Sequence, residues 1–143
     1  MDIIIGSDHA GYDMKESCRL FLEKDTGNGV TDVGVYSRQS SDYPDIARKV
    51  AQAVANREHE RGILICGSGI GMSIAANRYK GVRAALCHNL YLARLSRQHN
   101  DANILVMGGR IISVELALEI VGIFLNTEFE GGRHRKRIDL IDC

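Results

Sequence analysis

The sequence predicts an α/β protein, a three-layer α/β/α sandwich built on a Rossmann-like five-stranded parallel sheet and followed by a C-terminal arm. Two patterns support this fold class. Short apolar runs, typical of buried strands, alternate with longer segments in which apolar residues recur every three to four positions. The connections are short, and such alternation favours a parallel sheet covered by helices on both faces and wound by right-handed crossovers. With 143 residues, the chain is expected to form a single domain over 1–143.

The elements are expected in regular order along the chain. DIIIGSD is a buried strand that ends in a polar turn, and the helix after it, residues 11–24, has apolar residues such as Cys18 and Leu22 on one face. GVTDVG is the second strand. Tyr43 and the only proline, Pro44, begin the next helix, because proline suits the first helical turn. The remaining strands are expected at 62–65, 82–87 and 103–107, and the remaining helices at 69–77, 90–98 and 113–125.

The tail, EGGRHRKRIDLIDC, differs from the rest of the chain. It breaks at Gly131 and Gly132, restarts as a short basic segment and ends with the apolar residues Ile138, Leu140 and Ile141. A short segment with apolar residues at its end needs another surface to bury them. We therefore expect residues from about 127 to 143 to form an arm that packs on a partner subunit.

Composition argues against several classes of partner. The chain has 18 basic and 18 acidic residues, so no overall field favours nucleic acid or a membrane surface. No apolar run approaches the roughly 20 residues needed to span a bilayer, and the N-terminus MDIIIGSD lacks the basic start of a signal peptide. We expect a cytoplasmic protein in which any anionic ligand is held by local charges.

The four cysteines, Cys18, Cys66, Cys87 and Cys143, are far apart in the sequence, with no CxxC pair and no cysteine–histidine cluster at zinc spacing. Neither a disulfide framework nor a structural metal is expected. In a reducing compartment, a free cysteine is by default a small buried hydrophobic residue. A thiol redox function is disfavoured for Cys66, because no resolving cysteine lies near it in the sequence.

Polar residues follow four of the expected strands, at the ends where open parallel sheets bind ligands. These residues are Ser7, Asp8 and His9 after the first strand, CGSG at 66–69 after the third, His88 and Asn89 after the fourth, and GGR at 108–110 after the fifth. An acid, a histidine, a thiol, a glycine loop and an arginine are therefore expected on one rim of the sheet. We place the candidate site there.

The stretch CGSGIG at 66–71 is the most informative of these strand ends. Its glycines lack the spacing of the dinucleotide fingerprint G-x-G-x-x-G, and no G-K-[ST] follows them as in a P-loop. Ser73 in GMSIA would lie inside a helix rather than on the sharp turn of a nucleophile elbow. A glycine-rich turn entering a helix still exposes N–H groups that suit an oxyanion and favour a thiolate. Cys66 is therefore either a base beside an oxyanion hole or a buried cysteine beside closely packed glycines.

Seven motifs along nearly the whole chain resemble one family, the type B ribose-5-phosphate isomerases with the related galactose-6-phosphate and allose-6-phosphate isomerases. The motifs are GSDHAG at 6–11, SDYPD at 41–45, ILICGSGIGMSIAANR at 63–78, GVRAALC at 81–87, LSRQHNDANIL at 95–105, GGR at 108–110 and FEGGRHRKRI at 129–138. The resemblance implies aldose–ketose isomerisation of a sugar phosphate in the pentose phosphate pathway, without a metal or organic cofactor. It also implies a homodimer, or a dimer of dimers, whose sites lie between subunits.

The resemblance further implies roles for individual residues. Cys66 would move a proton between C1 and C2 of the sugar through an enediolate, whose oxygens the Ser68 hydroxyl and the loop amides would hold. His99, assisted by Asp8, would open the furanose ring, a task that suits a proton shuttle near neutrality. His9 and three arginines would bind the phosphate. The implied substrate-binding residues are Asp8, His9, Tyr43, Gly67, Ser68, Gly69, Ile70, Gly71, Asn100, Arg110, Arg133 and Arg137.

Two positions depart from the family pattern. Ser68 stands where threonine is more common, which keeps the hydroxyl. One branch of the family uses a glutamate where this chain has Met72, so Cys66 is the only plausible base in the loop. His99 follows the fourth expected helix, so we expect it on the rim opposite Cys66, where it would serve the neighbouring subunit's site.

The expected substrate is ribose 5-phosphate, converted to ribulose 5-phosphate. Five- and six-carbon sugar phosphates differ by one hydroxymethylene, and the pocket depth that discriminates between them is not visible in motifs. Allose 6-phosphate and galactose 6-phosphate therefore stay open as alternative substrates. A phosphosugar-binding module without catalytic activity is the alternative function.

Overall fold

The computed structural model describes all residues from Met1 to Cys143 and contains a five-stranded sheet in the order β2-β1-β3-β5-β4. Every neighbouring pair of strands is parallel. The strands are β1 (Asp2–Ser7), β2 (Gly29–Asp32), β3 (Arg61–Cys66), β4 (Ala84–Leu86) and β5 (Ile104–Gly108). The predicted parallel α/β fold is confirmed.

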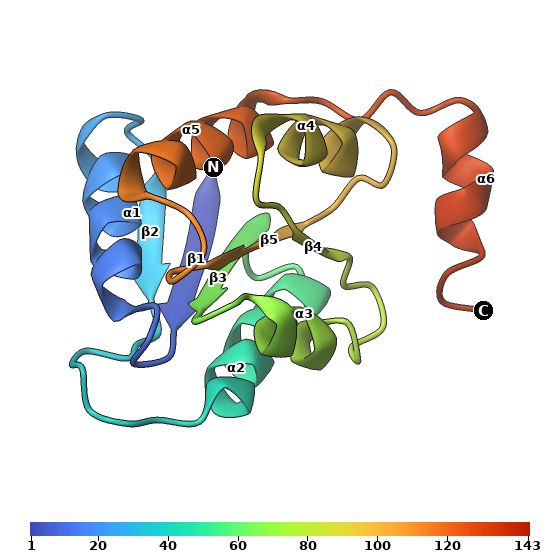
Figure 1. The fold of residues 1–143 in the computed structure, drawn as a ribbon. Helices are drawn as coiled ribbons and strands as arrows, with labels where there is room; N and C mark the ends of the chain where they lie inside the picture. The colour runs from blue at the N-terminus through green and yellow to red at the C-terminus, as the bar shows by residue number, and fades with distance from the viewer.

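Six helices accompany the sheet. They are α1 (Tyr12–Lys24), α2 (Tyr43–Ala55), α3 (Ile70–Ala76), α4 (Leu90–Gln98), α5 (Val114–Asn126) and α6 (Arg133–Asp139). In Figure 1, α2 and α3 cover one face of the sheet and α1, α4 and α5 cover the other, which makes three layers. None of the helices has both the length and the apolar character needed to cross a bilayer.

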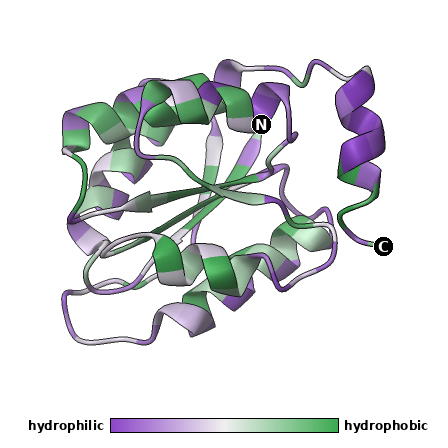
Figure 2. Ribbon diagram, turned by 45° about the vertical axis from the view of Figure 1, so that its right-hand side comes forward, coloured by the Kyte–Doolittle hydropathy of each residue, from purple (hydrophilic) through white to green (hydrophobic).

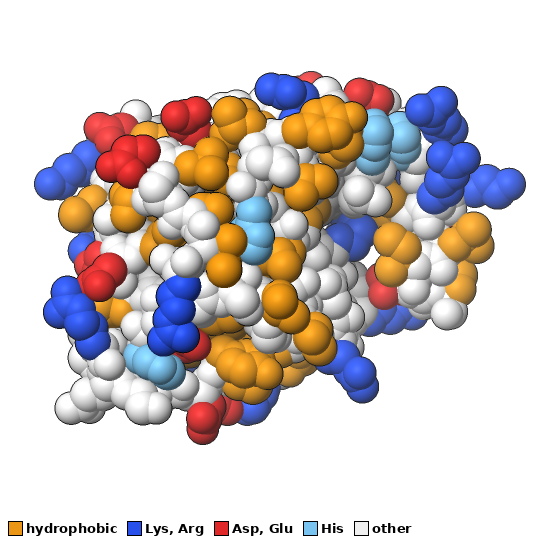
Figure 3. Space-filling view, in the orientation of Figure 1, with side chains coloured by type: hydrophobic (Ala, Val, Ile, Leu, Met, Phe, Trp, Pro, Cys, Tyr) orange, Lys and Arg blue, Asp and Glu red, His pale blue; other side chains and the backbone are white.

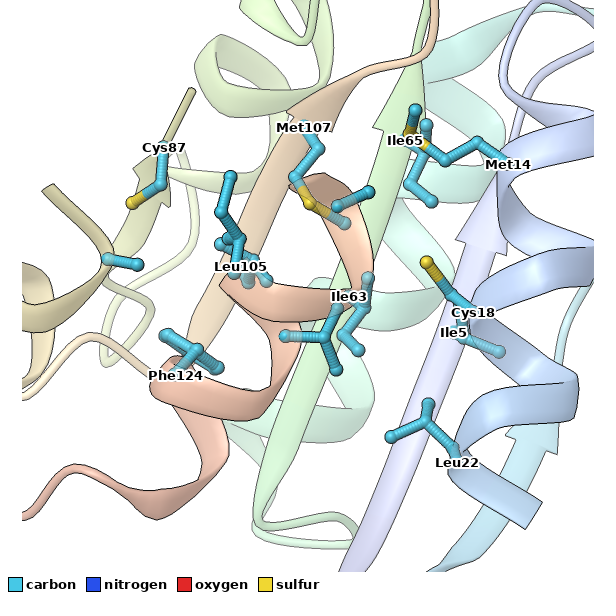
Figure 4. Packing of buried hydrophobic residues seen from close by; sticks show 14 of the residues in the cluster. Ile5, Met14, Cys18, Leu22, Ile63, Ile65, Cys87, Leu105, Met107 and Phe124 are labelled. Atoms are coloured by element: carbon cyan, nitrogen blue, oxygen red, sulfur yellow. The ribbon is translucent and has the colours of Figure 1, made fainter. Parts of the chain in front are cut away.

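The side chains of the central strands alternate between the two faces of the sheet, as the pleat requires. Ile5 and Ile63 belong to the core beneath α1 and α5, whereas Ile4 and Leu64 belong to the core beneath α2 and α3. Figure 4 shows the first core, in which the strand residues pack with Phe124 of α5. Burial on both faces explains why these strands read as continuous apolar runs.

Strand β4 is shorter than the strand expected over 82–87. The amide of Arg83 donates to the side-chain Oδ1 of Asn103 at 2.8 Å, and Nδ2 of Asn103 donates to the carbonyl of Gly81, also at 2.8 Å. The asparagine side chain therefore binds the amide of Arg83, while the carbonyl of Arg83 accepts from the backbone amide of Asn103 at 3.0 Å. The remaining three residues form a short strand at the edge of the sheet.

Helix α1 buries a lysine that apolar periodicity does not predict. Lys15 is fully buried, and its Nζ lies 2.6 Å from Oδ2 of Asp32, at the end of β2, and 3.1 Å from Oε1 of Glu16. The same Nζ lies 5.4 Å from the ring centres of Tyr12 and Tyr36. A buried charge of this kind is tolerated because it is paired and surrounded by aromatic faces.

The tail forms an arm with a helix of its own, α6, which stands away from the sheet in Figure 1 and is mostly hydrophilic in Figure 2. Figure 3 shows basic side chains gathered over it and a hollow between it and the rest of the molecule. The amide of Gly81 donates to Oδ2 of Asp142 at 2.9 Å, which ties the end of the arm to the domain. Leu140 and Ile141 are 62% and 56% exposed. Packing of the arm on a partner stays a prediction.

Candidate active site

The sheet order creates a switch point between β1 and β3, because the chain leaves β1 towards β2 on one side and leaves β3 towards the other strands. Open parallel sheets bind ligands in the crevice beyond such a point. A cleft of about 350 Å³ lies there. Its lining residues are Asp8, His9, Ala10, Tyr43, Cys66, Gly67, Ser68, Gly71, Arg110 and Ile111. The structure thus brings together most of the predicted residues of the strand-end rim.

Cys66 ends β3 and is 5% exposed at the floor of this cleft. Its sulfur accepts a hydrogen bond from the amide of Gly69 at 3.2 Å. Gly69 can turn its amide back in this way because its φ is +82°, a left-handed conformation in which a side chain would be strained. The other buried thiols lack such a loop, and burial raises the pKa of Cys18 to about 12 and that of Cys87 to about 11.

The glycine loop divides its amides between the protein and the cleft. The amide of Gly69 is used by Cys66, and the amide of Ile70 donates to Oγ of Ser68 at 3.2 Å. The amides of Gly67, Ser68 and Gly71 have no acceptor within the protein. We expected the amides of residues 67–71 to hold an oxyanion, but only those of Gly67, Ser68 and Gly71 are free to do so. Ser68 accepts from Ile70 but keeps its own hydroxyl proton for a ligand.

Tyr43 forms one wall of the cleft and sits directly against the glycine loop. A Cβ at position 71 would lie 2.6 Å from Cζ of Tyr43, so only glycine allows the ring to approach this closely. Tyr43 begins α2, where Asp42 and Pro44 flank it, and its side chain is 40% exposed. The phenol therefore borders the cleft, and its role in substrate binding stays a prediction.

Asp8 and His9 extend from the end of β1 into the cleft and are held in place by hydrogen bonds. Oδ1 of Asp8 accepts from the amide of Gly11 at 3.1 Å. The amide of His9 donates to Oγ of Ser41 at 3.1 Å, and the amide of Ser41 donates to Nδ1 of His9 at 3.2 Å. Because Nδ1 is an acceptor, the neutral ring carries its proton on Nε2, which can donate to a ligand. Sequence reasoning missed Ser41, although it opens the SDYPD motif.

Arg110 comes from the loop after β5 and is joined to the glycine loop through the backbone. Its amide donates to the carbonyl of Gly67 at 3.0 Å, and the amide of Gly109 donates to the carbonyl of Cys66 at 2.8 Å. A Cβ on Gly67 would lie 3.2 Å from Nη1 of Arg110. The guanidinium therefore lies against the loop that carries Cys66, where it can pair with an anionic ligand.

The other predicted residues line a second cleft, between the end of α4 and the arm. This cleft has a volume of about 460 Å³ and is lined by His99, Asn100, Arg133, His134, Arg137, Ile138 and Ile141. His99 is therefore not in the cleft that holds Cys66 and Asp8, which agrees with the expectation that the two lie apart in one chain. Arg133 and Arg137, one helical turn apart, line the same cleft.

The two histidines of this second cleft stack on each other. The ring centres of His99 and His134 are 4.4 Å apart, with 14° between the ring planes. Loss of hydration lowers the pKa of His134, and positive charge on His99 and Arg133 lowers it further, while Glu130 opposes the shift. Nε2 of His134 lies 3.7 Å from Oε2 of Glu130. Sequence reasoning did not anticipate this contact.

One group of side chains has the composition of a metal site. The candidate ligand atoms of His99, Glu130 and His134 all lie within 4.8 Å of one another. Two imidazoles and a carboxylate are ligands that zinc and related metals accept.

His88, which the sequence placed on the rim with Cys66, lines neither of these two clefts, and its Nε2 is buried without a partner.

Comparison with known proteins bears directly on this arrangement. Residues 3–141 match the family model described as Ribose/Galactose Isomerase. The chain belongs to this family. Ribose-5-phosphate isomerase B of Escherichia coli (strain K12) is 47% identical over 139 residues, covering 97% of this chain and 93% of that protein. A D-erythrulose-4-phosphate isomerase of Pectobacterium atrosepticum is 42% identical over 142 residues, covering 99% and 93%.

A solved structure agrees with these relatives. The crystal structure of a ribose 5-phosphate isomerase from Thermotoga maritima is 55% identical and has a TM-score of 0.96, covering 99% of this chain and 97% of that one. Family members with this fold are sugar-phosphate isomerases, so the chain is an aldose–ketose isomerase of a sugar phosphate. The cleft at the switch point of the sheet is the natural place for that reaction.

Proposed function

We propose that the protein interconverts D-ribose 5-phosphate and D-ribulose 5-phosphate. The observation that supports this most strongly is the cleft in which a thiol, three acceptor-free amides, a histidine and an arginine meet. The thiol and amides suit proton transfer next to a carbonyl, and the histidine and arginine suit a phosphate. Relatives named for ribose 5-phosphate, at 47% and 55% identity, support the same substrate.

Cys66 is the proposed base. As the thiolate, its sulfur takes the proton from C2 of the open-chain aldose, and the electron pair of that C–H bond forms the C1–C2 double bond of the enediolate. The negative charge moves to O1, where the amides of Gly67, Ser68 and Gly71 and the hydroxyl of Ser68 can donate hydrogen bonds. A proton then passes from O2 to O1, the electron pair left on O2 forms the C2=O double bond, and the C1–C2 double-bond pair takes the proton back from the Cys66 thiol at C1. This completes the ketose and regenerates the thiolate.

We further propose that the active site is completed by a second copy of the chain. His99, Asn100, Arg133 and Arg137 lie in a separate cleft, so they can reach the substrate held by Cys66 only from another subunit. In such a dimer His99, assisted by the neighbouring chain's Asp8, opens the furanose ring, and Arg133 and Arg137 join His9 and Arg110 at the phosphate. Exposed apolar residues on α3 and in the arm support association: Ile70, Ile74, Leu140 and Ile141.

The cytoplasm is the proposed location, and the pentose phosphate pathway the proposed setting. All four cysteines are free, and three of them are buried, which suits a reducing compartment. No cofactor is needed for the proposed chemistry, because the proton lost from C2 is the proton gained at C1.

Substrate choice is tested by measuring kcat/KM for four sugar phosphates: ribose 5-phosphate, allose 6-phosphate, galactose 6-phosphate and erythrulose 4-phosphate. Ribose 5-phosphate is expected to have the highest value. A higher value for a six-carbon or four-carbon substrate would replace the substrate but keep the reaction. Turnover of none of them, with ligand binding equal in wild type and Cys66→Ala, would favour a non-catalytic phosphosugar-binding module.

A further inference from the structure

A third cleft, rich in arginine, lies at the amino ends of the strands, on the opposite rim of the sheet from Cys66. It has a volume of about 550 Å³, and its charged lining comprises four arginines, Arg57, Arg61, Arg83 and Arg135, and two carboxylates, Glu60 and Asp101. His59 also lines it. We call it the rear cleft. None of these residues belongs to the proposed active site.

The rear cleft is assembled from parts of the chain that are far apart in sequence. Arg57 follows α2, Arg61 opens β3, and Arg83 precedes β4, while Arg135 is supplied by α6. The guanidinium of Arg135 lies 4.8 Å from the ring centre of Phe129, which holds it on the side of the arm. The cleft therefore lies between the arm and the body of the domain.

Two residues that line the rear cleft each have a buried side-chain atom without a hydrogen-bond partner, Nε of Arg61 and Nδ1 of His59. Only four such side-chain atoms occur in the whole protein, and half of them belong to residues that line this one cleft. Arg61 makes a single hydrogen bond of its own, from Nη1 to the carbonyl of Glu60 at 3.0 Å. Arg61 as a whole is half-buried, but its Nε is a donor without an acceptor, and an anion that enters beside it from the cleft would supply one.

The charged side chains of the rear cleft also favour an anion, because positive groups outnumber negative ones. Four guanidinium groups face two carboxylates, an excess of two positive charges. Arg83 already has acceptors within the protein, since its Nη2 donates to the carbonyl of Asp101 at 2.9 Å and lies 3.5 Å from Oδ2 of that residue. Burial lowers the pKa of Arg61, and the nearby cations Arg97 and Arg83 lower it further, against the effect of Asp101 and Glu60. An anion beside Arg61 would therefore stabilise its charged form.

We propose that the rear cleft is a binding site for a phosphate-bearing anion, separate from the active site. A phosphate dianion matches the excess of two positive charges, and its oxygens fit the planar donors of arginine. The cleft is much larger than a phosphate group alone, so it can also take an organic group attached to the phosphate. Because Arg135 belongs to α6 and the other arginines to the body, a bound phosphate would hold the arm to the domain.

The test measures binding of inorganic phosphate by titration calorimetry, at constant ionic strength set with sodium chloride. The background is Arg110→Ala/Arg137→Ala, which weakens phosphate binding at the proposed active site. About one phosphate per chain is expected to bind in this background. Adding Arg57→Gln/Arg61→Gln is expected to weaken that binding at least tenfold. Arg48→Gln is the matched control, since Arg48 is exposed, pairs with Asp45 and lies outside the cleft.

Two further comparisons make the result decisive. Ribose 5-phosphate and adenosine monophosphate are titrated beside ribose, and only the phosphorylated compounds are expected to bind in the rear cleft. If Arg61→Gln does not fold, the exposed residue Arg57 provides a second variant, Arg57→Gln, which should keep wild-type turnover in the absence of added phosphate. Absence of phosphate binding in the background variant, or binding that Arg57→Gln and Arg61→Gln leave unchanged, would overturn the proposal. Neither readout depends on which sugar phosphate the enzyme isomerises.

Discussion

The three buried cysteines of this protein differ in what surrounds the sulfur. Cys18 and Cys87 are enclosed by the core beneath α1 and α5, and burial keeps both thiols protonated near neutral pH. Cys66 is equally buried, but it ends a strand, lines a cleft and accepts the amide of Gly69. An N–H group aimed at the sulfur can stabilise negative charge there during proton transfer. Environment, rather than residue type, distinguishes the candidate base.

Replacing Cys66 by alanine removes the proposed base and leaves the phosphate contacts. We expect kcat for ribose 5-phosphate to fall by about 10²- to 10⁴-fold, the usual contribution of a general base, while KM changes little. Steady-state kinetics of Cys66→Ala measure this, with Cys143→Ala, an exposed cysteine far along the arm, as the control. A Cys66→Ala enzyme with more than a tenth of wild-type kcat would contradict the assignment.

At the scale of elements, an ion pair joins α1 to the edge strand β2. Lys15 is completely buried, whereas Asp32 keeps 17% of its side chain exposed. Water can therefore reach the carboxylate but not the ammonium group, so the charge of Lys15 relies more on the ion pair than that of Asp32 does. Strand β2 has little apolar surface of its own, because its residues alternate between exposed and half-buried positions. We infer that the Lys15–Asp32 contact fixes the position of α1 against this strand.

The variant Lys15→Ala is expected to lower the free energy of unfolding by about 3–5 kcal/mol, because it leaves Asp32 with only the longer contact to Nε of Arg19, at 3.9 Å, and empties a buried site. Denaturant unfolding at a fixed protein concentration measures the change. Lys24→Ala, at the exposed end of the same helix, should shift the free energy by less than about 0.5 kcal/mol. A loss below about 1 kcal/mol for Lys15→Ala would show that the pair is not a major contact.

A stacked pair of histidines, His134 of α6 and His99 at the end of α4, contributes to the attachment of α6, and this makes the attachment sensitive to pH. The folded-state pKa of His134 lies below its ordinary value, so the folded chain takes up this proton less readily than the unfolded chain. The resulting stabilisation is present above about pH 6.5, the ordinary value, and is lost as the pH falls towards the folded-state pKa. Attachment of the arm should therefore weaken in mild acid.

Hydrogen exchange of the amides of α6, compared at pH 8 and pH 5.5 after correction for the intrinsic exchange rate, measures this effect. Protection is expected to fall at the lower pH in wild type. His134→Phe keeps a ring for stacking on His99 but cannot be protonated, so its protection should change less. Equal losses of protection in both proteins would assign the pH effect to another group.

For the whole molecule, the main fact is that one chain carries the proposed site residues in two separate clefts. Cys66, His9 and Arg110 surround the first cleft, while His99 and Arg137 line the second. Under the proposed roles, neither cleft alone contains the base, the ring-opening histidine and all of the phosphate ligands. A dimer in which the second cleft of each subunit faces the first cleft of the other would complete two sites at once.

Mixed dimers test this arrangement directly. Cys66→Ala and His99→Ala homodimers should each be nearly inactive, but an equal mixture of the two chains forms hybrid dimers with one intact site. Random reassociation then predicts about a quarter of wild-type activity. Activity is measured after the chains are unfolded together and refolded, with each variant treated alone as the control. No recovery in refolded hybrids would place both residues in the site of a single chain.

Much of this protein can be predicted from its sequence. The alternation of apolar runs and helix-period segments is enough for the layers and the parallel sheet, because strands buried on both faces read as short apolar runs and helices repeat every 3.6 residues. The strand ends could also be located, and with them Asp8, Cys66 and Arg110, because parallel strands all end on the same rim. The seven motifs then linked these residues to one family of isomerases.

Other features depend on contacts between segments that are distant in sequence, and only the tertiary structure determined them. The strand order β2-β1-β3-β5-β4 decides which two strand ends form the crevice. The contact of Ser41 with His9, the burial of Lys15 and the stack of His99 on His134 each join residues that no local pattern relates. The sequence by itself determined which chemical groups lie at the strand ends. Packing determined which of them share a cleft, because a cleft is formed by whichever elements the core brings side by side.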